Sequence, residues 1–373
     1  MKNGSSNHVF ALIMAGGIGR NLWPVSRKKI PKQFLDLFDE GTMIAKTIER
    51  IRGSVIDENI LVITGELGRS LLLNSPGIIR PENIIVEPAS RNTAPCIALA
   101  TAYIKKRDPD AITVVLPSDH LVLDDAAFIK LVDSGIEIAR EKKGLVTIGI
   151  SADRPEDAYG YIQADEQLPL PLIDFEDYDF QLFRVKAFAE KPDYTTAVQF
   201  LESGDFYWNS GVFIWHIDAI SHEFERSMPD LYKDLLNIYE HIGTRSEDKV
   251  IEDVYSWIHP ISIDYGIMEK AELVFVLTGE FGWTDLGNWD EVMKVAGSRA
   301  VLGAEQPDSR LVQIDCENIY VRKPAGKVVC AIGISDVLIV ETDNALLVCG
   351  KGYSHRVGEV VDMLRREGLE EYL

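Results

Sequence analysis

Residues 10–32 read Phe10-Ala-Leu-Ile-Met-Ala-Gly-Gly-Ile-Gly-Arg-Asn-Leu-Trp-Pro-Val-Ser-Arg-Lys-Lys-Ile-Pro-Lys32. The short apolar start is typical of a parallel strand that is buried on both faces. Glycines follow where this strand ends, at the edge of an open α/β sheet where ligands bind. Glycine lets the backbone approach a phosphate and present its N–H groups, and the basic residues after it can offset phosphate charge. The segment therefore predicts a polyphosphate site.

The loop differs from two common nucleotide-binding motifs. The dinucleotide fingerprint has a third glycine where this chain has Leu22, and Trp23-Pro24 interrupts the helix that should follow. The P-loop needs Gly-Lys-Ser/Thr, and the chain contains no such triplet. A glycine-rich turn without any ligand would look similar, so the other motifs have to decide.

The composition is that of an ordinary globular protein, with 46% hydrophobic and 26% charged residues in a chain of 373. A net charge of −21 opposes nonspecific binding of nucleic acid. The apolar runs are too short to span a bilayer, and residues 1–8 lack the apolar core of a signal peptide. The four cysteines form no C-x-x-C pair and the histidines form no zinc-binding pattern. We expect a cytoplasmic protein without membrane or nucleic-acid partners.

Apolar strands alternate with helical patterns from residue 9 to about 150, and further strands are expected near residues 160–164, 183–190, 211–215 and 274–278. This alternation predicts an α/β fold with a Rossmann-like, doubly wound mixed sheet. After about residue 303, apolar triplets recur nine residues apart, at 319–321, 328–330, 337–339 and 346–348. That period indicates a small β-solenoid or β-roll, with antiparallel hairpins as the alternative. We expect a main domain over residues 1–300 and a β-rich domain with a terminal helix over 301–373.

Two acidic residues could hold a metal ion. Asp119 lies in Leu116-Pro-Ser-Asp-His120, directly after a predicted strand, and Asp285 lies in Trp283-Thr-Asp-Leu-Gly287. Mg²⁺ usually takes one or two carboxylates and leaves its other positions to water and phosphate. An aspartate taken by itself in such a segment is more often a cap or turn residue than a metal ligand.

Glu190-Lys191 ends another predicted strand just before Pro192. Lysine can bind a phosphate as a point charge, and glutamate can accept protons from sugar hydroxyls. An ordinary exposed ion pair is the alternative. Asn209 lies in the aromatic segment Tyr207-Trp-Asn-Ser-Gly-Val-Phe213, a mixture that suits a sugar ring but also a packed core.

In their order along the chain, these motifs resemble those of the mannose-1-phosphate guanylyltransferases, from residue 9 through the β-rich tail. The segments that carry the resemblance are the loop of residues 16–35, Glu87-Pro-Ala-Ser-Arg-Asn-Thr-Ala-Pro95, Pro117-Ser-Asp-His120, Tyr159-Gly-Tyr-Ile162, Glu190-Lys-Pro192, Trp208-Asn-Ser-Gly211, Ile263-Asp-Tyr-Gly-Ile-Met-Glu-Lys270 and Gly282-Trp-Thr-Asp-Leu-Gly287. The phosphomannose isomerase domain of bifunctional relatives is not part of the resemblance, and we expect that activity to be absent.

The resemblance implies transfer of GMP from GTP to α-D-mannose 1-phosphate, which yields GDP-mannose and pyrophosphate in a cytoplasmic enzyme with Mg²⁺ as cofactor. Residues 1–300 would be the catalytic nucleotidyltransferase domain, and a homodimer is a possible assembly. The roles that it implies are Mg²⁺ binding by Asp119 and Asp285, triphosphate binding by Lys32, sugar-phosphate binding by Lys191, nucleotide binding by Gly16, Gly17, Gly19, Arg20, Glu87, Asn92 and Thr93, and mannose binding by Gly160, Glu190 and Asn209.

The chain departs from the family pattern at one position. The family has Gly-x-Gly-Thr/Glu-Arg-Leu-Trp, with the arginine facing the leaving phosphates, whereas this chain has Asn21 at the arginine position and Arg20 beside it. An arginine that stabilises the transition state of phosphoryl transfer is worth about a thousandfold or more in rate. Two alternatives therefore stand beside the active enzyme: a weak or inactive paralogue that binds GTP or GDP-mannose as a regulatory subunit, and a nucleotidyltransferase for another sugar 1-phosphate.

Overall fold

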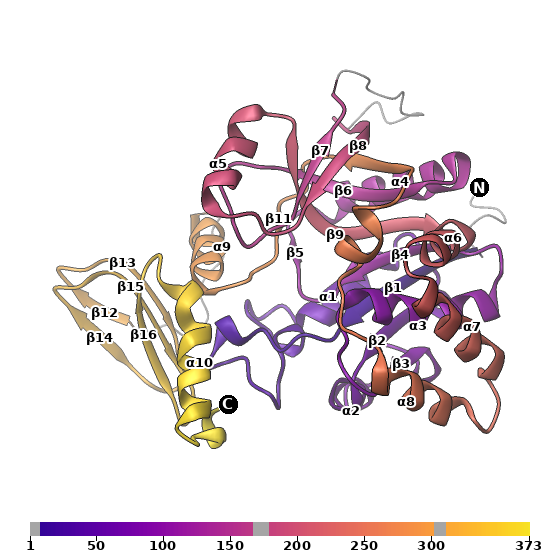
Figure 1. Ribbon diagram of the computed structural model, residues 1–373. Coiled ribbons are helices and arrows are strands. Elements are labelled where there is room, and N and C mark those ends of the chain that lie inside the picture. The colour runs from indigo at the N-terminus through magenta and orange to yellow at the C-terminus, as the bar shows by residue number, and fades with distance from the viewer. Residues whose placement is uncertain (1–7, 167–178, 302–310) are drawn as a thin grey trace. The chain divides into compact units, whose positions relative to one another are not determined.

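The computed structural model describes residues 8–166, 179–301 and 311–373 (Figure 1). Contacts divide the chain into two compact units. The sheet unit comprises residues 1–16, 47–118 and 122–283, and the tail unit comprises residues 17–46, 119–121 and 284–373. The domain boundary predicted between residues 300 and 301 stays a prediction. The contacts add the glycine loop and helix α9 (Trp289–Val301) to the tail.

Nine strands of the described chain form one mixed sheet in the order β3-β2-β1-β4-β9-β6-β10-β8-β7. The first four strands in this order are parallel, β9 is antiparallel to β4 and β6, and β10 is parallel to β6. The predicted mixed α/β sheet is confirmed. Its strands are β1 (Val9–Ala15), β2 (Ile60–Thr64), β3 (Ile84–Val86), β4 (Ile112–Pro117), β6 (Leu145–Ser151), β7 (Tyr161–Ala164), β8 (Gln181–Ala189), β9 (Phe206–His216) and β10 (Val274–Thr278), with β5 (Leu121–Val122) and β11 (Trp283–Thr284) outside this sheet.

Helices cover both faces of the sheet. Along β9, Phe213 and Trp215 lie in the same core cluster as the buried face of α3 (Thr93–Arg107), whereas Ile214 lies against Gly135 of α4 (Asp125–Lys142). Successive strand residues point to opposite faces, so α3 and α4 cover opposite sides. The other helices before α9 are α1 (Met43–Ile51), α2 (Glu66–Leu73), α5 (Tyr194–Ser203), α6 (Ile217–Ser227), α7 (Pro229–His241) and α8 (Glu247–Trp257).

The tail contains β12 (Leu311–Ile314), β13 (Glu317–Arg322), β14 (Val329–Ile332), β15 (Ser335–Glu341), β16 (Leu346–Gly350) and α10 (Val357–Arg366). β12 pairs in parallel with β14, and β13 with β15, so that Val312 lies opposite Cys330 and Ile319 opposite Val337. The two residues of each pair are 18 positions apart in the sequence, which equals two of the nine-residue periods. Two strands therefore make up each coil, as in a β-solenoid, while β15 and β16 form an antiparallel pair.

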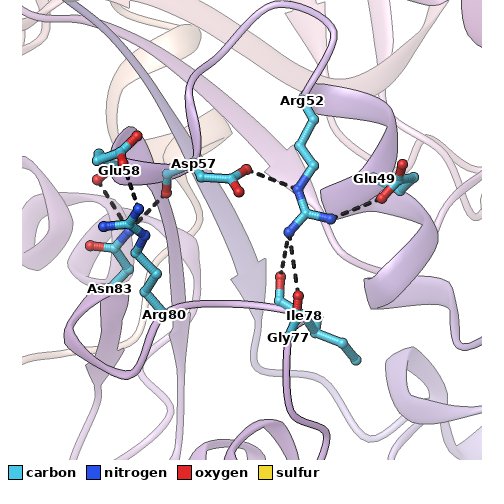
Figure 2. A network of polar contacts seen from close by, with 8 residues as sticks. All are labelled: Glu49, Arg52, Asp57, Glu58, Gly77, Ile78, Arg80 and Asn83. Carbon is cyan, nitrogen blue, oxygen red and sulfur yellow. Dashed lines mark hydrogen bonds and ion pairs between the residues drawn. The ribbon is translucent and has the colours of Figure 1, made fainter.

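Ion pairs close the amino-terminal edge of the sheet unit, before β2 and β3 begin (Figure 2). Arg52 donates to Asp57 at 2.9 Å, to Glu49 at 2.8 Å and to the carbonyl of Ile78 at 3.1 Å. A cavity of about 240 Å³ lies here, lined by Ile48, Arg52, Asp57, Ile60, Gly77, Ile78, Ile79, Arg80 and Pro81. None of the candidate site residues lines this cavity. The candidate residues that follow β1 and β3 lie at the opposite, carboxyl-terminal edge of the sheet.

Candidate functional site

The tail unit brings together three predicted residues that are far apart in the sequence. Lys32 begins a short 3₁₀ turn after Pro31, and its side chain is buried. Its ammonium nitrogen Nζ lies 3.0 Å from Oδ2 of Asp119 and donates to the backbone carbonyl of Asp285. A buried lysine needs such partners because an unpaired charge in the interior is costly. The loop cation and both predicted metal ligands are therefore neighbours.

The electrostatics of this cluster keep Asp119 ionised. Burial by itself would raise the pKa of the Asp119 carboxyl, but the charges of Lys32 and His120 and a hydrogen bond from Lys32 lower it below its ordinary value. The carboxylate of Asp285 accepts a hydrogen bond from the backbone N–H of Gly287 at 2.8 Å. The pair offers anionic oxygens, which are the ligands that a hard divalent cation prefers.

The glycine loop needs Gly19 for two reasons. Its φ of +73° is in the left-handed region, and a Cβ at this position would lie 2.3 Å from Cβ of Lys32. The backbone N–H of Lys32 also donates to the carbonyl of Ile18 at 3.0 Å. The glycine loop therefore packs directly against Lys32. A Cβ on Gly16, directly after β1, or on Gly17 would meet no atom within 4 Å among the described residues.

Arg20 and Asn21 both face the C-terminal helix α10. The guanidinium of Arg20 lies 3.3 Å from the carboxylate of Asp362. Gly358 lies so close to the loop that a Cβ there would be 2.8 Å from Oδ1 of Asn21. Both side chains at the position where this chain departs from the family pattern therefore lie next to α10.

The sheet unit brings the three predicted mannose-binding residues together. A Cβ on Gly160 would lie 2.6 Å from Oε2 of Glu190 and 3.4 Å from Cβ of Asn209. The backbone N–H of Asn209 donates to the carbonyl of Gly160 at 2.8 Å. A side chain at this position would displace the carboxyl of Glu190, so the three residues form one small polar site.

Glu190 in this site holds its proton unusually well. Burial raises the pKa of Glu190 to about 7, and the negative charge of Asp264 adds to the rise, while Lys191 opposes it. Lys191, with a φ of +47°, is largely exposed, and its Nζ lies 4.0 Å from Glu190. The carboxyl of Glu190 can thus donate or accept a hydrogen bond near neutral pH.

Asp264 is a residue to which the sequence analysis assigned no role. It accepts a hydrogen bond from the side-chain amide of Asn209 at 2.9 Å, and burial raises its pKa. It begins a π-helix, Asp264–Met268, a form that is frequent at functional sites. The available signal was its position inside the segment of residues 263–270, which the family resemblance already included.

The predicted nucleotide-binding residues Glu87, Asn92 and Thr93 lie after β3 and at the start of α3, and the resemblance would place them near guanine. The carboxyl of Glu87 is buried and accepts a hydrogen bond from the hydroxyl of Tyr255 at 3.0 Å. Asn92 caps α3 by accepting from the N–H of Thr93, and the hydroxyl of Thr93 accepts from the N–H of Ile263 at 2.8 Å. These side chains shape the loop, and their role toward a base stays a prediction.

Comparison with known proteins gives a consistent result. Residues 10–299 match the nucleotidyl transferase family, and residues 309–364 match the MannoseP isomerase/GMP-like beta-helix domain. The chain is 33% identical over 377 residues to mannose-1-phosphate guanylyltransferase of Escherichia coli K12, with 99% of this chain and 76% of that protein covered. The chain belongs to the mannose-1-phosphate guanylyltransferases of the nucleotidyl transferase family. It is therefore an enzyme, a nucleotidyltransferase.

Further relatives agree with this membership. The chain is 35% identical to a putative mannose-1-phosphate guanylyltransferase of Vibrio cholerae, with 97% of this chain and 75% of that protein covered. A crystal structure described as mannose-1-phosphate geranyltransferase from Thermus thermophilus superposes with a TM-score of 0.81 at 32% identity, and it covers 96% of this chain and 99% of its own.

Nucleotidyltransferases typically use a divalent metal ion. In the part of the chain that the structure describes, no three His, Cys, Asp or Glu side chains converge as ligands of one metal ion. A pair of carboxylates completed by phosphate and water is the arrangement that Mg²⁺ commonly uses. Within residues 8–166, 179–301 and 311–373, the helices are too short or too polar to cross a lipid bilayer.

Proposed function

We propose that the protein transfers GMP from GTP to α-D-mannose 1-phosphate and releases GDP-mannose and pyrophosphate. A phosphate oxygen of the sugar phosphate forms a bond to the α-phosphorus of GTP, and the bond from that phosphorus to the bridging oxygen of pyrophosphate breaks. The observation that carries the proposal is the buried ammonium of Lys32 held between Asp119 and Asp285. Membership in the guanylyltransferases supports the choice of substrates.

The chain's own residues align the reactants and neutralise charge, which phosphoryl-type transfer needs more than covalent catalysis. Lys32 binds the triphosphate, and Lys191 binds the phosphate of the sugar. The remaining roles are nucleotide binding by Gly16, Gly17, Gly19 and Arg20, guanine binding by Glu87, Asn92 and Thr93, and mannose binding by Gly160, Glu190 and Asn209.

Asp119 and Asp285 would hold the metal ion, for which we propose Mg²⁺. The donor chemistry agrees, because buried Lys32 contacts the carboxylate of Asp119 and the backbone carbonyl of Asp285, and Asp285 carries a second carboxylate. A bound Mg²⁺ would neutralise charge on the phosphate oxygens during transfer.

Pyrophosphate release from GTP and mannose 1-phosphate tests the proposal. We expect release that requires both substrates and a divalent metal ion, and GDP-mannose formed in equal amount. A panel of other nucleoside triphosphates and sugar 1-phosphates separates the guanylyltransferase from an enzyme for another sugar. Calorimetric binding of GTP without any turnover would instead identify the regulatory paralogue.

We also propose that the protein forms a homodimer and acts in the cytoplasm. The support for a dimer is an exposed apolar face on the β12–β14 pair, where Val312, Ile314 and Ile332 are each more than half exposed. Light scattering after size exclusion measures the mass in solution, and a monomer at micromolar concentration would contradict the dimer. The cytoplasmic location rests on the four cysteines, which form no disulfide within the described residues, as is usual in a reducing compartment, and fractionation of the source cells tests it.

A further inference from the structure

The side-chain amide of Asn209 is held in one orientation by its neighbours. Its oxygen Oδ1 accepts a hydrogen bond from the backbone N–H of Gly211 at 3.1 Å. The hydroxyl of Thr147 lies 3.3 Å from the same oxygen, but its single proton is shared with the carbonyl of Val212 at 3.2 Å. Its nitrogen Nδ2 donates to Oδ1 of Asp264 at 2.9 Å. A flipped amide would place Nδ2 against the N–H of Gly211 and its oxygen against a carboxylate. The N–H of Gly211 and the carboxyl oxygen of Asp264 therefore select the amide orientation together.

The backbone that carries Asp264 is anchored from its other side. The N–H of Ile263 donates to the hydroxyl of Thr93 at 2.8 Å, and the carbonyl of Ile261 accepts from Ala94 at 3.0 Å. The hydroxyl of Tyr265 reaches the carbonyl of Glu190 at 3.4 Å. These contacts lie within the sheet unit, so Asp264 is presented to Asn209 by a fixed turn.

We propose that Asp264 is a positioning residue for the sugar 1-phosphate, acting through Asn209. One Nδ2 hydrogen of Asn209 is used by Asp264, and the second is left for a hydroxyl oxygen of the sugar, beside Gly160 and Glu190. The inference rests on the proposed function, because it deepens the assignment of this site to mannose.

The test compares Asp264→Ala, Asp264→Asn and the exchanged pair Asn209→Asp with Asp264→Asn. Alanine removes the acceptor, and KM for mannose 1-phosphate should rise about tenfold to a hundredfold, the range for losing a hydrogen bond to a charged group. Asparagine keeps a neutral oxygen acceptor, which bonds more weakly than a carboxylate, so Asp264→Asn should recover part of that loss. KM for GTP should change less than about twofold in both, because the hydroxyl of Thr93 is bound by the backbone N–H of Ile263, which neither variant removes.

The exchanged pair separates positioning from a structural role. The amide introduced at position 264 would then donate to the carboxylate introduced at position 209. That carboxylate still accepts from the N–H of Gly211, so the thermal midpoint should return toward the wild-type value. The hydrogen offered to the sugar is nevertheless gone, and KM for mannose 1-phosphate should stay high. Asp253→Asn, an exposed acid-to-amide change on α8, is the matched control and should leave both KM values unchanged.

Three results would overturn the inference. These are an unchanged KM for mannose 1-phosphate in Asp264→Ala, an equal rise in KM for GTP, and recovery of KM together with stability in the exchanged pair. Wild-type protein that neither turns over nor binds mannose 1-phosphate in calorimetry would overturn the proposed function and this inference with it. If the wild type binds mannose 1-phosphate without turnover, the dissociation constants of the variants replace KM.

Discussion

Replacing Glu87 by glutamine should raise the free energy of unfolding, relative to that of the wild type, as the pH becomes alkaline. Glu87 is only 7% exposed, and the partners of its carboxyl are the hydroxyl of Tyr255 and the thiol of Cys96. Burial raises the pKa of Glu87 to about 7 from an ordinary value of 4.5, although both hydrogen bonds act in the opposite direction. The neutral acid is thus favoured in the folded chain.

The direction in which the free energy of unfolding changes with pH follows from proton linkage. The folded chain binds this proton more tightly than the unfolded chain, so Glu87 contributes most to the free energy of unfolding below pH 4.5. That contribution falls as the pH rises and levels off above about pH 7. The 2.5-unit difference, from 7 − 4.5, corresponds to about 3 kcal/mol, of which roughly 2.5 kcal/mol is lost between about pH 5 and pH 8.5. Glutamine keeps an acceptor for Tyr255 and never ionises.

The assay is urea unfolding followed by tryptophan fluorescence, at about pH 5 and pH 8.5, for the wild type and Glu87→Gln. The free energy of unfolding of the variant relative to the wild type should rise by about 2.5 kcal/mol between the two pH values. Exposed Glu66→Gln is the control and should show no such change. A difference between the variant and the wild type that is the same at both pH values would refute the reasoning.

Four further outcomes are expected. Lys32→Ala should lower kcat about a hundredfold or more, and it should also lower the stability because Asp119 loses its buried partner. Lys32→Arg should fold and recover part of the rate. An unchanged kcat in Lys32→Ala would contradict the role of Lys32 in binding the triphosphate. EDTA should abolish pyrophosphate release and Mg²⁺ restore it, with Asp119→Asn and Asp285→Asn each raising the Mg²⁺ concentration for half-maximal rate, and a metal-independent rate would contradict this assignment. Asn21→Arg should raise kcat if the loop lacks a cation, and an unchanged kcat would show that existing cations suffice. KM for mannose 1-phosphate should rise as the pH increases through about 7, because Glu190 gains a negative charge beside the sugar phosphate, and Glu190→Gln should flatten that part of the profile.

Much of the fold and part of the site could be predicted from local sequence. A continuous apolar run followed by glycines indicates a buried strand and its ligand-binding edge, because burial on both faces allows only apolar side chains. The nine-residue period in the tail predicts a solenoid. Residues 217–257 have a helical pattern that does not show where one helix ends and the next begins. The structure divides them into three helices, because Pro229 begins one and Gly243, with a φ of +82°, follows its end.

The pairings between distant segments could not be predicted, because a period along the chain says which residues share a face but not what lies opposite. The 18-residue offset of the parallel tail strands is one example. The hydrogen bond between Asn209 and Asp264 is another, since it joins residues 55 positions apart.

By itself, the sequence determined that this protein has a glycine-rich loop directly after a strand of an α/β sheet and the ordered motifs of the guanylyltransferases, because these features are local in the chain. Only the tertiary structure decided which side chains meet. It brought Lys32 to Asp119 and Asp285, turned Arg20 toward Asp362, and gave Asp264 a partner in Asn209. The physical reason is that charges and hydrogen-bond donors act over a few ångströms in space, whatever their separation in the chain.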